Sequence, residues 1–180
     1  MLMKRCFWCN EKNPLYVKYH DEEWGVPRFD DEYLFEMLLL ESFQAGLSWE
    51  CVLNKRVNFR KAFDNFDREK IALYSEEKIL SLKEDKGIIR NERKIRAAVK
   101  NAEIFGKIVE ECGSFYNYLR LFWDGETICE NDKTTSQLSD SISADLIKRG
   151  MKFCGSTIIY SFLQAVGVIN SHDDNCYMHK

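Results

Sequence analysis

Apolar residues recur at helical spacing along nearly the whole 180-residue chain, and this periodicity restricts the fold more than any other feature of the sequence. One such run passes from Leu34 to Ala45, and another begins after Ser48. Asn91 is placed to cap a long helix that ends at Gly113. Because alternating strand patterns are rare, the sequence predicts an all-α fold with roughly eight helices of ordinary length.

Nothing in the chain resembles a flexible linker, a repeat or a low-complexity tract, so we expect residues 1–180 to form one globular domain. Within it we expect a helix from Ser114 through Trp123, a surface loop from Asp124 to Ser136, and helices again from about Ser141. The longest uncharged run, Phe153 to Ser171, is too polar to cross a membrane and is expected to be mostly a buried helix.

The formal net charge of -3 argues against a protein that coats nucleic acid without regard to sequence, so any contact with DNA must come from local patches. The stretch Lys83–Lys100 is rich in lysine and arginine, whereas Glu110–Asp132 is acidic. Each alone is typical of a solvated helix face. Seven cysteines, an odd number, and the lack of an apolar stretch after Met1 lead us to expect a cytoplasmic location.

Residues 141–167 have the pattern of two helices joined by a tight turn. The turn carries two glycines and three cations, which are Gly150, Gly155, Lys148, Arg149 and Lys152. Backbone amides at the start of the second helix, near Ser156, would bind an anion such as a phosphate. An ordinary helical hairpin explains the spacing equally well.

Four candidate metal ligands lie at the two ends of the chain, and their types suit tetrahedral zinc: Cys6, His20, His172 and Cys176. Their spacing is not that of a standard zinc finger, and Cys9 is a rival thiolate ligand. With four protein ligands such a site would be closed and structural, and it would join the N- and C-terminal segments without a position for an activated water.

Glu41 follows an apolar run in the segment MLLLESFQAGLSW. A carboxylate half-buried there must find a partner or shift its pKa, which makes it a candidate site residue. A salt bridge to a lysine or arginine of another helix is the alternative. Tyr19, Trp24 and Trp49 lie near it in sequence and could sandwich a flat ring, although each alone is more typical of a core.

Five long blocks in this order resemble the 3-methyladenine DNA glycosylase I family of the helix-hairpin-helix superfamily: RCFWC, PLYVKYHDEEWGVP, LFEMLLLESFQAGLSW, KGIIRNERKI and KRGMKFCGSTIIYSFLQAVGVINSH. The resemblance spans nearly the whole chain. It implies the helix-hairpin-helix glycosylase fold and an enzyme that flips 3-methyladenine out of alkylated double-stranded DNA and removes it by hydrolysis. It also implies structural zinc, and we expect a monomer with neither a membrane nor a protein partner.

The resemblance implies a role for each of these features. Glu41 matches the family's base-reading catalytic carboxylate, Trp49 its stacking ring, and Tyr19 and Trp24 other pocket walls. The turn containing Gly46 and Leu47 resembles the loop that fills the gap left by the extruded nucleotide. The hairpin residues Lys148, Arg149, Gly150, Lys152 and Gly155 resemble the phosphate-gripping element, and the zinc set maps onto Cys6, His20, His172 and Cys176.

One departure from the wider superfamily concerns the mechanism. Most members carry an aspartate soon after the hairpin, and the aligned position here is Asn170; Asp173 and Asp174 are expected to belong to the zinc loop. Because methylation at ring position 3 makes adenine cationic and weakens the glycosidic bond, the aspartate can be absent. No lysine has a nucleophilic setting, so we expect no strand cleavage.

Two other classes compete with the glycosylase. A non-catalytic helical DNA-binding protein would account for the hairpin, the basic stretch and the zinc ligands, but it leaves Glu41 beside aromatic residues unexplained. A zinc hydrolase or deaminase would use Glu41 as a proton shuttle, but the His-x-Glu and Pro-Cys-x-x-Cys signature of nucleobase deaminases is missing.

Overall fold

The computed structural model describes residues 4–179, which are mostly helical as predicted and contain one short pair of strands. Its α-helices are α1 (Pro14–Glu22), α2 (Asp31–Gln44), α3 (Trp49–Leu53), α4 (Arg56–Ala62), α5 (Arg68–Ala72), α6 (Glu76–Glu84), α7 (Glu92–Cys112), α8 (Phe115–Leu119), α9 (Gln137–Lys148) and α10 (Ser156–Ala165). A short helical turn spans Asp64–Phe66. Two short strands, β1 (Ile128–Cys129) and β2 (Ile169–Asn170), pair in parallel, with Ile128 opposite Ile169.

Helix ends set by local chemistry lie where the sequence predicts them. The Asn91 side chain accepts a hydrogen bond from the Lys94 backbone amide at 3.2 Å, and α7 ends at Gly113, which adopts φ of 82°. Such a left-handed residue closes a helix most easily when it is glycine, because a side chain would be strained there. These two caps place α7, the longest helix of the described residues.

Four details of the helix prediction were wrong. The described residues form ten α-helices rather than roughly eight, partly because the run after Ser48 breaks into α3 and α4. The helix α8 ends at Leu119 instead of continuing to Trp123. The helix α9 begins at Gln137, ahead of Ser141, because Ser136 and Ser139 form a reciprocal capping box. The predicted loop from Asp124 to Ser136 contains β1.

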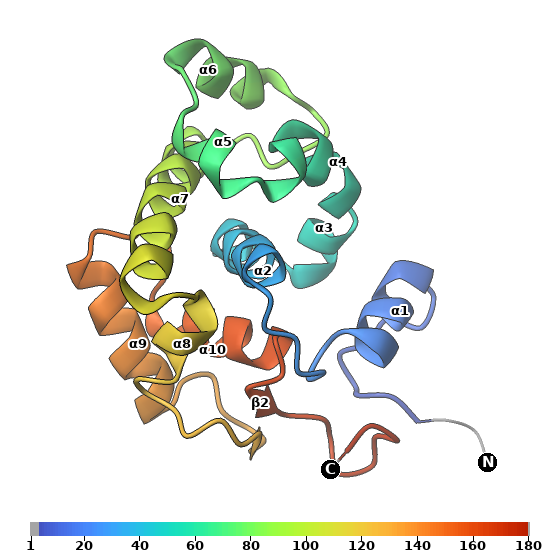
Figure 1. Cartoon of the computed structure of the whole chain (residues 1–180). Helices are drawn as coiled ribbons and strands as arrows, with labels where there is room; N and C mark the ends of the chain where they lie inside the picture. The colour runs from blue at the N-terminus through green and yellow to red at the C-terminus, as the bar shows by residue number, and fades with distance from the viewer. Residues whose placement is uncertain (1–3, 180) are drawn as a thin grey trace.

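The helix α2 is the centre of the molecule and is surrounded by other helices (Figure 1). Every residue from Tyr33 to Phe43 is buried, which agrees with the rule that a helix apolar on all sides belongs inside a core. Glu36 is charged although it is buried in this helix, and its carboxylate forms ion pairs with Arg56 and Arg60 at 2.5 and 2.8 Å. The other buried carboxylate of α2 is Glu41, which faces a cavity described below.

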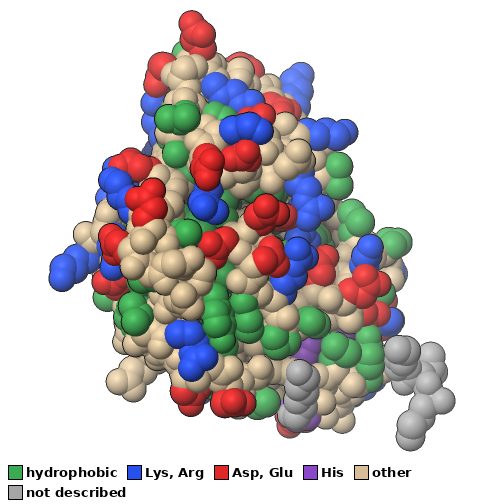
Figure 2. All heavy atoms as spheres, viewed as in Figure 1, with side chains coloured by type: hydrophobic (Ala, Val, Ile, Leu, Met, Phe, Trp, Pro, Cys, Tyr) green, Lys and Arg blue, Asp and Glu red, His purple; other side chains and the backbone are tan. Residues whose placement is uncertain are grey.

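The helices α9 and α10 pack against each other as a hairpin, and the segment after β2 runs back toward the N-terminal segment (Figure 1). There the Tyr177 backbone amide donates to the Lys4 carbonyl oxygen at 3.0 Å. On the face shown in Figure 2, acidic and basic side chains are interspersed. Among the described helices, none has the length and apolar character needed to cross a membrane.

Candidate active site and metal centre

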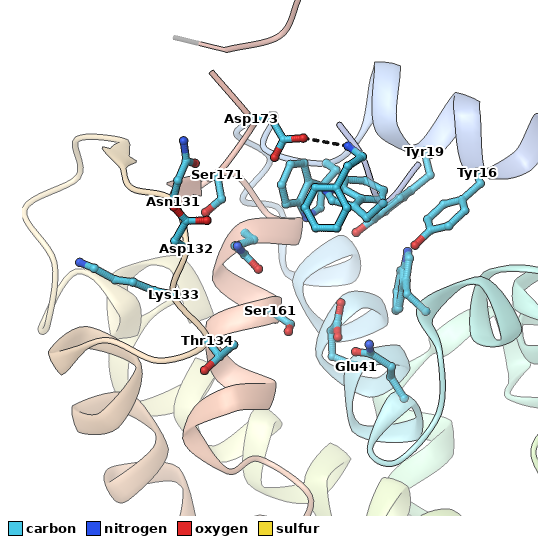
Figure 3. A pocket seen from close by; sticks show the side chains of 16 residues that line it. Tyr16, Tyr19, Glu41, Asn131, Asp132, Lys133, Thr134, Ser161, Ser171 and Asp173 are labelled. Atoms are coloured by element: carbon cyan, nitrogen blue, oxygen red, sulfur yellow. Dashed lines mark hydrogen bonds between the residues drawn. The ribbon is translucent and has the colours of Figure 1, made fainter. Parts of the chain in front are cut away.

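A cavity of about 480 Å³ opens between α1, α2, α10 and the loop that precedes α9. All four residues predicted for a base-binding pocket line it, namely Tyr19, Trp24, Glu41 and Trp49. Figure 3 shows Glu41 on one side with Tyr16 and Tyr19, while Ser161, Thr134 and Lys133 lie across from them. The fold therefore gathers the predicted carboxylate and aromatic rings around one space that is large enough for a purine.

The Glu41 side chain is buried, and no counterion lies beside it in the part of the chain that the structure describes. Its residue is 3% exposed, and Oε2 has no hydrogen-bond partner among the described residues. Burial raises the pKa of this carboxyl from its ordinary 4.5 to about 8. A salt bridge to a lysine or arginine was the alternative prediction, but the structure gives those partners to Glu36 on the same helix. Glu41 is therefore a buried acid that has no ion-pair partner among residues 4–179.

The aromatic rings around Glu41 leave polar groups free for a ligand. Tyr19 and Trp49 lie 5.2 Å apart between ring centroids at 46°, and the buried Nε1 of Trp49 has no acceptor among the described residues. Trp24 meets the His172 ring edge-on at 4.6 Å, so its indole separates the cavity from the candidate metal ligands. Buried polar atoms without partners are rare in proteins and often mark ligand sites.

Several residues that line the cavity were missed by the sequence analysis. Tyr16 lies three residues before Tyr19, and Gln44 three residues after Glu41, so helical spacing would have found both. Ser161 and Gln164 are polar positions three residues apart on the largely apolar α10. The loop residues 131–134 also line the cavity, and no local pattern in the sequence indicates this.

The raised pKa of Glu41 predicts a stability effect of Glu41→Gln. The folded chain holds this proton up to about pH 8 and the unfolded chain only to about 4.5, so wild-type stability falls as pH rises between these values. Glutamine does not titrate, so the variant should match wild type near pH 5 and exceed it at pH 9 by on the order of 4 kcal/mol, since each pKa unit is worth about 1.4 kcal/mol. Urea unfolding at both pH values checks this, with the exposed Glu77→Gln as control; equal pH slopes in all three proteins would contradict it.

The four predicted metal ligands meet in one buried cluster. The ligand atoms of Cys6, His20, His172 and Cys176 all lie within 4.8 Å of one another. The Nδ1 atom of His172 is 3.3 Å from the Cys6 Sγ and 3.5 Å from the Cys176 Sγ, and the His20 Nε2 is 3.4 Å from the Cys176 Sγ. Burial lowers the pKa of His172 to about 4, so its ring is neutral, as a metal ligand must be. This donor set fits a small tetrahedral metal ion.

Surrounding groups orient these ligands. The His20 Nδ1 contacts the Asp21 Oδ1 at 2.8 Å, and the His172 Nε2 contacts the Trp24 carbonyl oxygen at 3.2 Å. Such contacts fix which ring nitrogen would face a bound metal ion. Cys9 lies outside the cluster, and its thiol contacts the Tyr16 carbonyl oxygen at 3.9 Å instead. The geometry therefore favours Cys6 over its rival.

The turn and the hairpin predicted to contact DNA have the expected shapes. Gly46 adopts φ of 80°, and Leu47 beside it is 42% exposed. Gly150 adopts φ of 103° at the end of α9, and Gly155 caps α10. The side chains of Lys148 and Lys152 are exposed. Arg149 is different, because its guanidinium pairs with Asp145 at 2.7 Å and Glu111 at 2.6 Å.

Comparison with known proteins places the chain in a family. A family model described as methyladenine glycosylase matches residues 8–179. The chain belongs to the methyladenine glycosylase family. It is 45% identical to DNA-3-methyladenine glycosylase 1 of Escherichia coli strain K12 over 181 residues, which cover 97% of this chain and 96% of that protein.

Solved structures of the family have the same fold. A crystal structure of 3-methyladenine DNA glycosylase I superimposes with a TM-score of 0.94 at 42% identity and covers 98% of this chain and 100% of that one. The Staphylococcus aureus enzyme, solved to explain 3-methyladenine recognition, gives a TM-score of 0.91 at 32% identity, with 97% and 96% covered. Family membership decides against the non-catalytic DNA-binding protein and the zinc deaminase as alternatives.

In this methyladenine glycosylase Asn170, the residue expected to align with the superfamily's aspartate, forms a hydrogen bond with the backbone. The Asn170 Oδ1 accepts a hydrogen bond from the His172 amide at 3.1 Å, which shapes the turn that leads to this candidate ligand. Asp173 accepts from the Phe7 amide at 2.8 Å, a contact drawn in Figure 3. The Asp173 carboxylate thus helps to join the two terminal segments, and Asp173 also reaches the cavity wall.

Proposed function

We propose that this chain is a DNA repair glycosylase that extrudes 3-methyladenine from alkylated double-stranded DNA and hydrolyses its glycosidic bond, leaving an abasic site. The observation that carries this proposal is the buried, unpartnered Glu41 facing an aromatic cavity of about 480 Å³. Adenine methylated at ring position 3 is a flat cation in DNA. A cavity that offers both rings and an uncompensated acid is complementary to that lesion and not to neutral adenine.

The cavity recognises the lesion by its positive charge. Entry of the cationic base supplies the partner that Glu41 lacks, which favours the carboxylate over the neutral acid. The rings of Trp49 and Tyr19 provide faces for stacking, and Trp24 closes the wall toward the metal ligands. Leu47 on the exposed turn fills the space left by the extruded nucleotide, and the α9–α10 hairpin binds the phosphate backbone through its turn and Lys148 and Lys152.

Hydrolysis then needs little from the protein beyond placement and charge. The bond between the sugar carbon and the base nitrogen breaks, its electron pair goes to the purine, and the base departs neutral because it began as a cation. The oxygen of a water molecule bonds to the sugar carbon and loses a proton to solvent. Selection therefore takes place in binding, and an aspartate at the position of Asn170 is not needed.

No covalent intermediate with a lysine is expected. Lys133 lines the cavity, but its ammonium pairs with Glu130 at 2.5 Å. Lys94 is buried, and its ammonium donates to two backbone carbonyl oxygens. A lysine nucleophile needs a free amine that reaches the sugar carbon, and both of these ammonium groups are engaged by other partners. The proposed enzyme is accordingly monofunctional, and we expect it to act as a monomer.

The metal in this proposal is zinc with a structural role. Zinc bonds of about 2.3 Å to sulfur and about 2.0 Å to nitrogen place neighbouring ligand atoms of a tetrahedron about 3.5 Å apart. The measured separations of 3.3 to 3.5 Å agree with that value. Four protein ligands fill the shell, so zinc would join the two ends of the chain and supply no activated water.

Incubation of the purified protein with methylated duplex DNA tests the function. Chromatography of the released bases should show 3-methyladenine, and borohydride should trap no adduct between protein and DNA. Release of other methylated bases alone would contradict the proposed specificity. Absence of any release would leave the proposal without its central activity, and a trapped adduct would overturn the monofunctional assignment.

A further inference from the structure

Lys94 is a buried residue of α7, and its ammonium lies at the C-terminal end of α2, the helix that carries Glu41. Its Nζ donates to the Phe43 carbonyl oxygen at 2.7 Å and to the Ala45 carbonyl oxygen at 2.6 Å. The last carbonyls of any helix lack partners within it, and a cation there also complements the negative end of the helix dipole. Lys94 therefore fixes the end of α2 and the direction in which the Gly46–Leu47 turn leaves it.

The same face of α7 also fixes the hairpin. The Lys94 ammonium lies 5.8 Å from the ring centroid of Phe153, which adopts φ of 54° in the α9–α10 turn. Asn101 exchanges two hydrogen bonds with the backbone of Lys152, each 2.9 Å long. Lys94 and Asn101 are seven residues apart, about two helical turns or about 10 Å. One rigid helix thus contacts both segments that are proposed to engage DNA.

Lys94 differs from its neighbours in the basic stretch. Arg96 pairs with Glu76 and Glu92, and Lys100 pairs with Glu103, all on the surface where such pairs contribute little to stability. Lys94 is 6% exposed and donates to neutral carbonyl groups, although burial of a charge is costly. A solvated helix face explains Lys100 but not Lys94.

We propose that Lys94 is a positioning residue for DNA engagement, which together with Asn101 holds the Gly46–Leu47 turn and the α9–α10 hairpin in the relative placement that a duplex requires. The inference rests on the proposed function and gives Lys94 no contact with DNA or base. A misplacement of about 1 Å in such a support can lower a rate about 100-fold. Binding of the free base should be spared, because Lys94 is not among the residues that line the cavity.

The test compares Lys94→Met with Lys100→Met, which removes the same charge from the same helix. Two quantities are measured: kcat/KM for base release from methylated duplex DNA, and the Kd of free 3-methyladenine from the fluorescence of the cavity tryptophans. Lys94→Met should lower kcat/KM about 10- to 100-fold and leave the Kd unchanged. Lys100→Met should change either value less than about fivefold.

A double-mutant cycle separates positioning from general destabilisation. If Lys94 acts through the turn, Lys94→Met should add less than about threefold in a Leu47→Ala background, because coupled residues are not additive. Asn101→Ala tests the hairpin side of the same support, and it replaces Lys94→Met in both measurements if that variant does not fold.

The outcomes are distinct. Loss of duplex activity with unchanged free-base affinity and a non-additive cycle supports the inference. Equal losses in both measurements, or an additive cycle, would overturn it while the proposed function stands. A wild-type protein that releases no base would overturn the proposed function itself, and this inference with it.

Discussion

Replacement of Glu41 by glutamine should lower the rate of 3-methyladenine release from methylated duplex DNA about 100- to 1,000-fold. Glutamine keeps the size of the side chain and its place in the cavity but cannot carry the negative charge that offsets the cationic base. Because each 1.36 kcal/mol changes a rate tenfold, the expected loss corresponds to about 3–4 kcal/mol of transition-state stabilisation. Single-turnover base release measures it.

The matched control for this variant is Glu77→Gln, the same substitution at an exposed position of α6. It should release base at the wild-type rate. A Glu41→Gln enzyme as fast as this control would show that the buried carboxylate does not read the lesion. Retained folding of Glu41→Gln, already expected from the stability argument above, excludes unfolding as the reason for a slow rate.

Loss of one metal ligand should have the largest effect on stability. Cys176→Ser removes one buried cysteine from the proposed zinc cluster, and a loss of about 4 kcal/mol or more is typical when a structural metal is lost. For a chain of this length that lowers Tm by about 8–16 °C. Thermal unfolding, together with the metal content of the purified protein, measures both consequences.

Cys129→Ser is the control, because Cys129 is an exposed cysteine outside the cluster. It should retain one zinc per chain and the wild-type Tm. Chelation of the wild type should unfold the protein rather than leave a folded, inactive enzyme. If Cys176→Ser unfolds at the same temperature as Cys129→Ser and keeps its metal, the four residues are not a structural zinc site.

Sequence alone predicted the features that depend on local chemistry or on residue type. Asn91 and Gly113 bound α7 because a side-chain cap and a left-handed glycine act within a few residues. The type and number of candidate ligands predicted the cluster of Cys6, His20, His172 and Cys176, although their roles at a metal stay predictions.

Features that depend on tertiary contacts were missed. The sequence alone did not show that Ser136, rather than Ser141, caps the start of α9 through a reciprocal capping box. Lys94 lies in a basic stretch typical of a solvated face. Its burial depends on tertiary contacts with the carbonyl groups at the end of α2, which the sequence does not indicate. The loop residues 131–134 reach the cavity because β1 pairs with β2, a long-range contact that two-residue strands do not reveal in sequence.

The pH dependence of kcat/KM tests the central claim most directly, namely that the ionised Glu41 carboxylate recognises the cationic lesion. This parameter reports groups of the free enzyme, in which burial raises the Glu41 pKa to about 8. Wild-type kcat/KM should therefore rise about tenfold per pH unit from about pH 6 and level off near pH 8, whereas the residual activity of Glu41→Gln should lack this rise. A wild-type profile that is flat over this range, or the same rise in Glu41→Gln, would contradict the account.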